Sequence, residues 1–207
     1  GASVSVPPET SGAEYLDLMY RLFLQRFPGD APLLFAGFSF GGAIATHFAA
    51  RLGERVTHLC LISPAGFAPR QGPRPPTRSY KDADDDEGLL REICRHNLLV
   101  NMLSDAENLS DETLDIQTYC VRHTRFNSRK VSRGGTLLGD LAKRKCRLRV
   151  LWGEGDDSVF RRTDDMLSQL RAVVNDLDLH RIPNAGHWAA YENAPVVNRL
   201  MQAFFKT

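Results

Sequence analysis

The amino-acid sequence predicts an α/β fold with a mostly parallel, doubly wound sheet. Three observations predict it. Four short apolar runs have strand character, an alanine-rich run with helical spacing joins the first two of them, and helical patterns follow the last two. A strand–turn–helix–strand order is typical of a parallel sheet, because parallel strands need a crossover connection. The four runs are PLLFAGF (32–38), HLCLIS (58–63), RLRVLW (147–152) and DLHRIP (178–183).

The elements follow in order along the chain. The first two predicted strands contain no strict alternation of apolar and polar residues, as expected of strands covered on both faces. The segment 41–53 between them is predicted to form a helix that ends at Gly53, a residue suited to a C-terminal cap. The next crossover helix is predicted over 161–174. A closing amphipathic helix is predicted over 194–206, where Pro195 falls in the first turn.

The segment between the second and third predicted strands has a different character. It opens with a stretch rich in proline, glycine and arginine and then shows short helical patterns over 87–103 and 111–124. Such a segment is too long for a plain loop and has apolar positions of its own. We therefore expect one domain over 1–207, with a core of 1–64 and 147–207 and a helical insertion of about 65–146.

The composition is that of an ordinary globular protein, with 43% hydrophobic and 25% charged residues. A formal net charge of +1 gives no global reason to expect nucleic acid or an acidic membrane as a partner. We interpret the basic run at 143–149 and the acidic run at 81–87 as solvated segments, not as a nucleic-acid patch and a metal site. No apolar run approaches the roughly 20 residues of a membrane span.

The four cysteines are widely scattered, and none stands at a C-x-x-C or Cys/His spacing typical of structural zinc. Cys60, inside an apolar run, is expected in the core. Free thiols favour a reducing compartment. We therefore expect a cytoplasmic protein without a metal or a cofactor.

The run Gly37-Phe38-Ser39-Phe40-Gly41 fits the pattern G-x-S-x-G between a predicted strand and a predicted helix. Such a turn projects the serine hydroxyl above the carboxyl ends of the strands, where ligands bind in parallel sheets. The alternative is the glycine-rich turn of a nucleotide-binding fold. That fold places an acidic residue about 20 positions further on, after the next strand. Here the next strand ends in ISPAG, without an acid.

A nucleophilic serine needs a base, and six histidines are available. His187 is favoured because it lies in a loop after the last predicted strand, at the same edge of the sheet as Ser39. Asp156 follows the third predicted strand and could fix the tautomer of the histidine. Asp157 is the competing acid, and Glu154 is a more distant choice. The order serine, acid, histidine is that of the nucleophile-elbow hydrolases.

With these residues in place, the chain resembles proteins of the α/β-hydrolase superfamily. GFSFGG, LWGEGDDSV and IPNAGHWAAYENAP match its nucleophile, acid and histidine motifs, and the insertion lies where many members carry a helical cap. The resemblance implies catalytic roles for Ser39, Asp156 and His187. The backbone N–H of Phe40 would be one donor of the oxyanion hole.

The resemblance covers only the latter part of that fold. A loop of the form G-x-G-x-S commonly follows the fourth strand in these proteins, and GAS at positions 1–3 resembles its tail. On that alignment the first four strands, the first helix and the loop giving a second oxyanion donor have no counterpart. We therefore expect the strand at 32–38 to be an exposed edge, and the chain to be a fragment.

The expected function is hydrolysis of a small carboxylic ester or thioester through an acyl-enzyme, in a pocket between core and cap. Phe38 and Trp188 are candidate walls of that pocket. The His187-Trp188 pair also resembles the meta-cleavage product hydrolases, which cleave C–C bonds and hold an acidic substrate with a cap arginine. Near the position where those enzymes carry the cap arginine, this chain has Gln117, with Arg122 and Arg125 nearby.

A non-catalytic hydrolase-fold binding module is a third hypothesis, although such a module need not keep all three triad groups. The partner expected on either enzymatic hypothesis is a small-molecule substrate. The sequence leaves a homodimer open.

Overall fold

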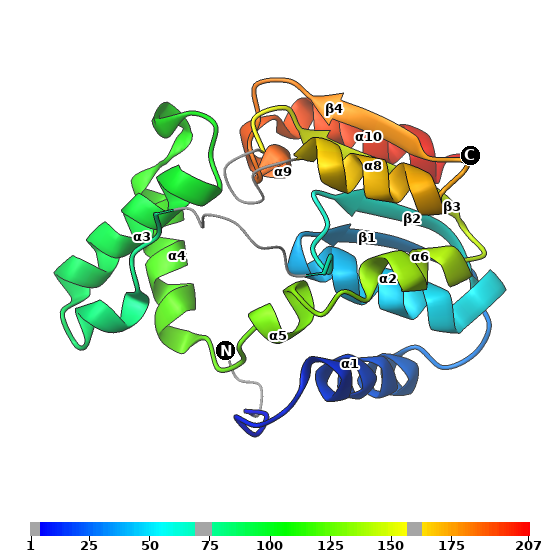
Figure 1. Cartoon of the computed structure of the whole chain (residues 1–207), viewed down its shortest axis with the longest axis horizontal. Helices are drawn as coiled ribbons and strands as arrows, with labels where there is room; N and C mark the ends of the chain where they lie inside the picture. Colours follow the sequence, from blue (N-terminus) through cyan, green and yellow to red (C-terminus); the bar gives the residue numbers. More distant parts are fainter. Residues whose placement is uncertain (1–4, 69–75, 157–162) are drawn as a thin grey trace.

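The computed structural model of the chain describes residues 5–68, 76–156 and 163–207. Its centre is a sheet in which the strands lie in the order β1–β2–β3–β4, all with parallel pairing (Figure 1). Each strand coincides closely with one of the predicted runs, and the predicted parallel sheet is confirmed. The strands are β1 (Leu33–Phe38), β2 (Val56–Ile62), β3 (Arg147–Gly153) and β4 (Asp178–Ile182).

Helices occupy the predicted crossovers and also two segments that were not predicted, 12–26 and the single turn 189–192. The first part of the helix predicted over 161–174 lies outside the described residues. At the start of the helix over 12–26, Ser11 and Glu14 form a capping box, and this pair is its sequence signal. The helices are α1 (Gly12–Arg26), α2 (Phe40–Leu52), α3 (Glu87–Asn101), α4 (Asp111–His123), α5 (Arg129–Ser132), α6 (Leu137–Lys143), α8 (Thr163–Val173), α9 (Ala189–Glu192) and α10 (Ala194–Phe205), with the 3₁₀ turns η1 (Gly53–Arg55), η2 (Tyr80–Ala83) and η3 (Ala106–Asn108).

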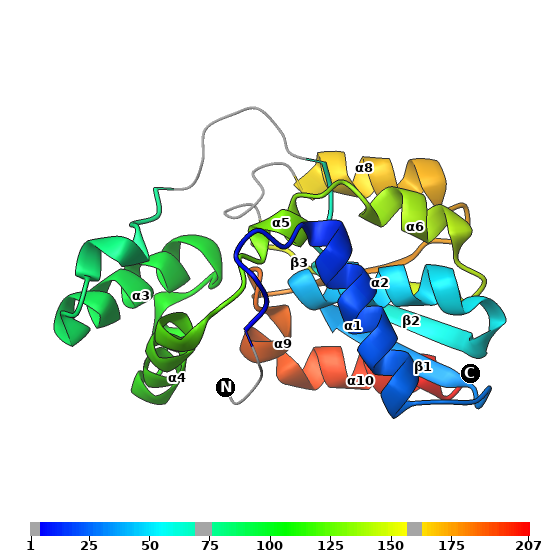
Figure 2. The ribbon, with the colours of Figure 1, turned by 90° about the horizontal axis from the view of Figure 1, so that it is seen from below.

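The central strands β2 and β3 are largely buried on both faces, which explains their continuous apolar runs. Alternate side chains of β2 point to opposite faces: Leu59 packs in one core cluster with α2, α6 and α8, and Cys60 packs in another with α10. Figure 2 shows α6 and α8 on one side of the strands and α10 on the other. Burial raises the pKa of the Cys60 thiol to about 12, so this cysteine is an inert core residue, as expected.

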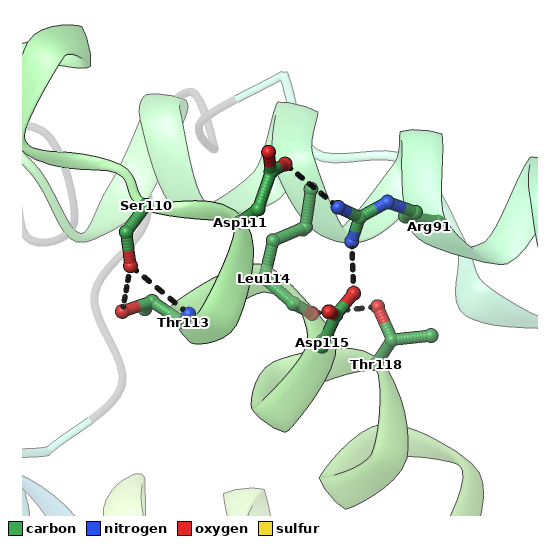
Figure 3. Close-up of polar contacts among 7 residues, drawn as sticks. All are labelled: Arg91, Ser110, Asp111, Thr113, Leu114, Asp115 and Thr118. Atoms are coloured by element: carbon green, nitrogen blue, oxygen red, sulfur yellow. Dashed lines mark hydrogen bonds and ion pairs between the residues drawn. The ribbon is translucent and has the colours of Figure 1, made fainter.

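Helices α3 and α4, joined by η3, form a separate layer beyond the carboxyl ends of the strands (Figure 1). This α3–α4 layer has its own apolar cluster, which includes Leu90, Ile93 and Leu114. Figure 3 shows Arg91 of α3 reaching two carboxylates of α4, those of Asp111 and Asp115. Such exposed ion pairs add little to stability, so the apolar cluster holds the two helices together.

The insertion expected over about 65–146 is not uniform. Helix α6 falls inside that range, yet its Leu137 and Leu141 pack in the larger core cluster with the sheet. Gly66 and Leu137 are also joined by a backbone hydrogen bond of 3.1 Å. We therefore propose that the cap is the α3–α4 layer alone and that the chain has rejoined the core by α6.

In the part of the chain that the structure describes, strand β1 pairs on one side only, with β2. The expected edge position is confirmed. The expectation that this strand is covered on both faces is wrong, because Leu34 and Ala36 are exposed, Leu34 to 50%. None of the described helices is both long and apolar enough to cross a lipid bilayer.

The exposed edge leads to a prediction about self-association. Replacing Leu34 by lysine should reduce association of the chain, because a charge on an edge strand opposes strand-to-strand pairing. Sedimentation velocity at increasing concentration measures the effect. Leu22→Lys on α1 is the matched control, since Leu22 is 49% exposed and belongs to a helix and not to the edge strand. Equal behaviour of the two variants would contradict a specific role for the edge.

Candidate active site

The turn between β1 and α2 holds Ser39 in an unusual backbone conformation, with φ of 46° and ψ of −115°. Conformations of this kind cost of order 1–3 kcal/mol in a non-glycine residue and persist only where the surroundings fix them. Here the Ser39 N–H donates to the carbonyl of Ile62 at 3.0 Å. The Ser39 carbonyl accepts from the N–H groups of Gly42 and Ala65, both at 2.9 Å.

Two glycines make this turn possible. A Cβ on Gly37 would lie 2.6 Å from the carbonyl oxygen of Gly41, and one on Gly42 would lie 2.9 Å from Cβ of Pro64. A Cβ on Gly41 would meet no heavy atom within 4 Å. Of the two glycines in the motif, only Gly37 is crowded, and on the helix side the crowded position is Gly42.

The structure brings the three predicted side chains together. His187 Nε2 lies 2.8 Å from Ser39 Oγ, and His187 Nδ1 lies 3.0 Å from Asp156 Oδ2 and 3.1 Å from Oδ1. Asp156 and His187 are buried, with relative exposures of 0% and 1%. A buried carboxylate that accepts from Nδ1–H leaves Nε2 with its lone pair, which is the form that can accept the serine proton.

Three strand ends supply these groups. The carboxyl ends of parallel strands meet at one edge of a sheet, so the turns after β1, β3 and β4 all lie at that edge. The turns after β3 and β4 touch directly, since a Cβ on Gly153 would lie 2.1 Å from the carbonyl oxygen of Gly186. Gly155 N–H also donates to the Ala185 carbonyl at 2.9 Å. This contact places the Asp156 turn against the His187 loop.

The competing acids have different positions. Glu154 is exposed, whereas Asp156 is buried beside the imidazole. Asp157 lies outside the described residues. Among the residues described, no three His, Cys, Asp or Glu side chains gather so as to hold a metal ion.

Three aromatic residues of the serine and histidine motifs, Phe38, Phe40 and Trp188, contact different parts of the structure. Phe38 lies against the histidine, with 5.1 Å between the ring centroids. Phe40 begins α2, so its N–H has no acceptor within the helix. Its ring packs near those of Tyr15 and Phe126, at centroid distances of 6.1 and 6.4 Å. Trp188 packs against the apolar cluster of the α3–α4 layer.

A cavity of about 480 Å³ lies beside the site, between the His187 loop and the end of the α3–α4 layer. Phe38 and Trp188, the expected pocket walls, are not among its lining residues. It is lined by Ser104, Asp105, Asn108, Gly155, Asn184, Ala185 and Glu192. The sequence reasoning gave no role to Glu192, although this residue stands within the quoted histidine motif.

Comparisons with known proteins agree with this arrangement. A sequence model of the Alpha/beta hydrolase family matches residues 2–200. The 2-hydroxy-6-oxononadienedioate/2-hydroxy-6-oxononatrienedioate hydrolase of Paraburkholderia xenovorans is 29% identical over 182 residues, which cover 81% of this chain. The 2-hydroxy-6-oxo-6-phenylhexa-2,4-dienoate hydrolase of Burkholderia cepacia is 27% identical over 187 residues, again covering 81% of this chain. The chain spans about 60% of the length of each.

Solved structures share the fold at low sequence identity. A serine hydrolase from Cycloclasticus zankles superposes with a TM-score of 0.70 at 18% identity, covering 100% of this chain and 76% of its own. A thermophilic esterase from Thermogutta terrifontis gives 0.69 at 17% identity, with coverages of 100% and 76%. The family model covers most of the chain, and the arrangement of serine, histidine and acid agrees with it. The chain belongs to the alpha/beta hydrolase family.

Proposed function

We propose that this chain is a hydrolase that cleaves small carboxylic esters or thioesters through an acyl-enzyme formed on Ser39. The observation that carries the proposal is the continuous hydrogen-bonded chain from Ser39 Oγ through His187 to the buried Asp156. A neutral hydroxyl is a poor nucleophile, and a histidine in hydrogen-bond contact can take its proton as it attacks. General-base catalysis of this kind contributes about 10²–10⁴ in rate.

The first half of the reaction acylates the serine. Ser39 Oγ attacks the carbonyl carbon of the substrate while His187 Nε2 takes the hydroxyl proton. The carboxylate of Asp156 stabilises the imidazolium through Nδ1–H. The N–H of Phe40, at the positive end of α2, is a donor for the oxyanion that develops. Collapse of the intermediate breaks the bond to the leaving alcohol or thiol, which receives the proton from His187.

The second half releases the acid. A water molecule attacks the acyl carbon while His187 Nε2 takes one of its protons. The tetrahedral intermediate then collapses, the bond to Ser39 Oγ breaks, and the serine recovers its proton from the histidine. The products are the carboxylic acid and the free enzyme, so no cofactor is consumed.

A second candidate is cleavage of a C–C bond in an acidic meta-cleavage product. The names of the curated relatives favour it, since both describe hydrolases of hydroxy-oxo-dienoate or dienedioate compounds. Two arginines of the expected insertion argue against it. Arg122 pairs with Glu87 at 2.7 Å, and Arg125 donates to Ser5 Oγ at 3.2 Å, so both are engaged elsewhere. The ester therefore remains the first candidate.

The nucleophile can be tested by covalent labelling. A fluorophosphonate probe should label the chain, and Ser39→Ala should abolish that labelling because the attacking oxygen is removed. Intact-mass spectrometry gives the stoichiometry. Ser79→Ala, which changes an exposed serine of the insertion, is the control and should label normally. Labelling that survives Ser39→Ala would mean that another residue is the nucleophile.

The acid can be tested by steady-state kinetics. Asp156→Asn should lower kcat by about 10⁴, since the amide no longer holds the productive histidine tautomer. Glu154→Gln, at an exposed neighbouring carboxylate, should have little effect. A larger loss in Asp157→Asn than in Asp156→Asn would move the acid to the adjacent position.

The two substrate classes can be compared directly. We expect a higher kcat/KM for p-nitrophenyl butyrate than for 2-hydroxy-6-oxo-6-phenylhexa-2,4-dienoate, because Arg122 and Arg125 already have other partners. Both reactions are followed spectrophotometrically on one preparation, with Ser39→Ala as the blank. The opposite order of kcat/KM would make C–C hydrolysis the better assignment.

A further inference from the structure

Glu192 lies at the end of α9, in the turn that follows His187, and its carboxylate accepts five hydrogen bonds. Oε1 accepts from three groups of the neighbouring layer at 2.8 to 3.0 Å and from a fourth at 3.2 Å: Ser104 N–H, Ser104 Oγ–H, Asn108 Nδ2–H and Asp105 N–H. Oε2 accepts from the N–H of Gly186 at 2.6 Å. One carboxylate thus joins the α3–α4 layer to the residue before His187.

The chemistry of this contact requires a carboxylate. All five partners present a hydrogen to Glu192, and an ionised carboxylate is acceptor-only. A glutamine in the same place would have to turn its NH₂ group toward one of these donors. The single amide oxygen of glutamine would still accept hydrogen bonds. Glutamine should therefore preserve the hydrogen bonds made by one of the two carboxylate oxygens of Glu192 and lose those made by the other.

The His187 loop is attached to the same segment at a second point. Trp188 N–H donates to the carbonyl of Met102 at 2.9 Å. The backbones are also in close contact, because a Cβ on Gly186 would lie 2.9 Å from the nitrogen of Ser104. The residues on both sides of His187 are therefore bound to the segment that ends α3.

The far end of this segment is fixed by another residue of α9. The Tyr191 hydroxyl donates to the Asn108 carbonyl at 2.6 Å and lies 3.0 Å from Thr113 Oγ1, near the start of α4. The connection between α3 and α4 is thus held along its length by α9 and by the His187 loop. Any displacement of the α3–α4 layer would pull on the residues that flank the imidazole.

We propose that Glu192 is a positioning residue: it ties the His187 loop to the end of α3, so that the imidazole stays between Ser39 and Asp156. The catalytic part of this inference rests on the proposed function. The geometric part does not, because it concerns the position of His187 in the resting chain. The position of the His187 imidazole then depends on how the α3–α4 layer packs against the His187 loop. A misplacement of about 1 Å at a catalytic group can cost about 10²-fold in rate.

Three variants test the proposal in the full 207-residue chain: Glu192→Ala, Glu192→Gln and the control Glu107→Gln. Glu107 is an exposed carboxylate on the same connection. The readouts are kcat and KM for p-nitrophenyl butyrate, the NMR signal of the His187 Nδ1 proton, and hydrogen exchange of the amides at 102–108 and 184–188. Thermal unfolding shows whether each variant is folded.

We expect Glu192→Ala to lower kcat by about 10²-fold with a smaller change in KM, to broaden the Nδ1 proton signal and to speed exchange in both segments. Glu192→Gln should fall between the alanine variant and the wild type, and Glu107→Gln should match the wild type. If Glu192 only stabilised the fold, replacing it would lower the unfolding temperature without changing the Nδ1 signal of the folded protein.

Two results would overturn the proposal. One is an unchanged Nδ1 signal and kcat in a folded Glu192→Ala or Glu192→Gln variant. The other is an equal effect of Glu107→Gln. If the wild type hydrolyses no ester but Glu192→Ala still disturbs the Nδ1 signal and the exchange, the positioning role stands and the proposed function fails.

Discussion

The backbone of Ser39 is the constraint on which the rest of the site depends. Ser39 has φ of 46°, which is unusual for a residue other than glycine. Its N–H donates to the end of β2 and its carbonyl accepts from the start of α2, and these hydrogen bonds hold the conformation. The turn closes only because Gly37 and Gly42 leave room for backbone and for Pro64. The local strain is the cost of presenting one hydroxyl above the strand ends at the start of a helix, where backbone N–H groups are free to bind an anion.

The parallel sheet brings the Ser39 turn together with the other residues of the site. Because β1, β3 and β4 run in the same direction, their following turns meet at one edge, and residues 148 positions apart come within hydrogen-bond distance. Burial of Asp156 and His187 removes competing water and strengthens the contact between them. The α3–α4 layer extends this arrangement, since Glu192 and the backbone of Trp188 fasten it to the histidine loop.

Sequence reasoning could predict the elements whose signals are local. The four strands, the helix after Ser39 and the assembly of Ser39, Asp156 and His187 follow from apolar runs, a glycine pattern and the rule that parallel strand ends meet. Helix α1 was missed although Ser11 and Glu14 carry a capping signal. The packing of α6 in the core and the four bonds from residues 104–108 to Glu192 could not be predicted, because both depend on contacts between segments distant in the chain.

In the proposed mechanism Ser39 carries the acyl group between the two halves of the reaction. Rapid quenching of the chain with p-nitrophenyl butyrate, followed by peptide mass spectrometry, detects that acyl group. We expect a butyryl group on the peptide that contains Ser39, formed within the first turnover. Release of p-nitrophenol at the full rate with no adduct, or with an adduct on another residue, would contradict it.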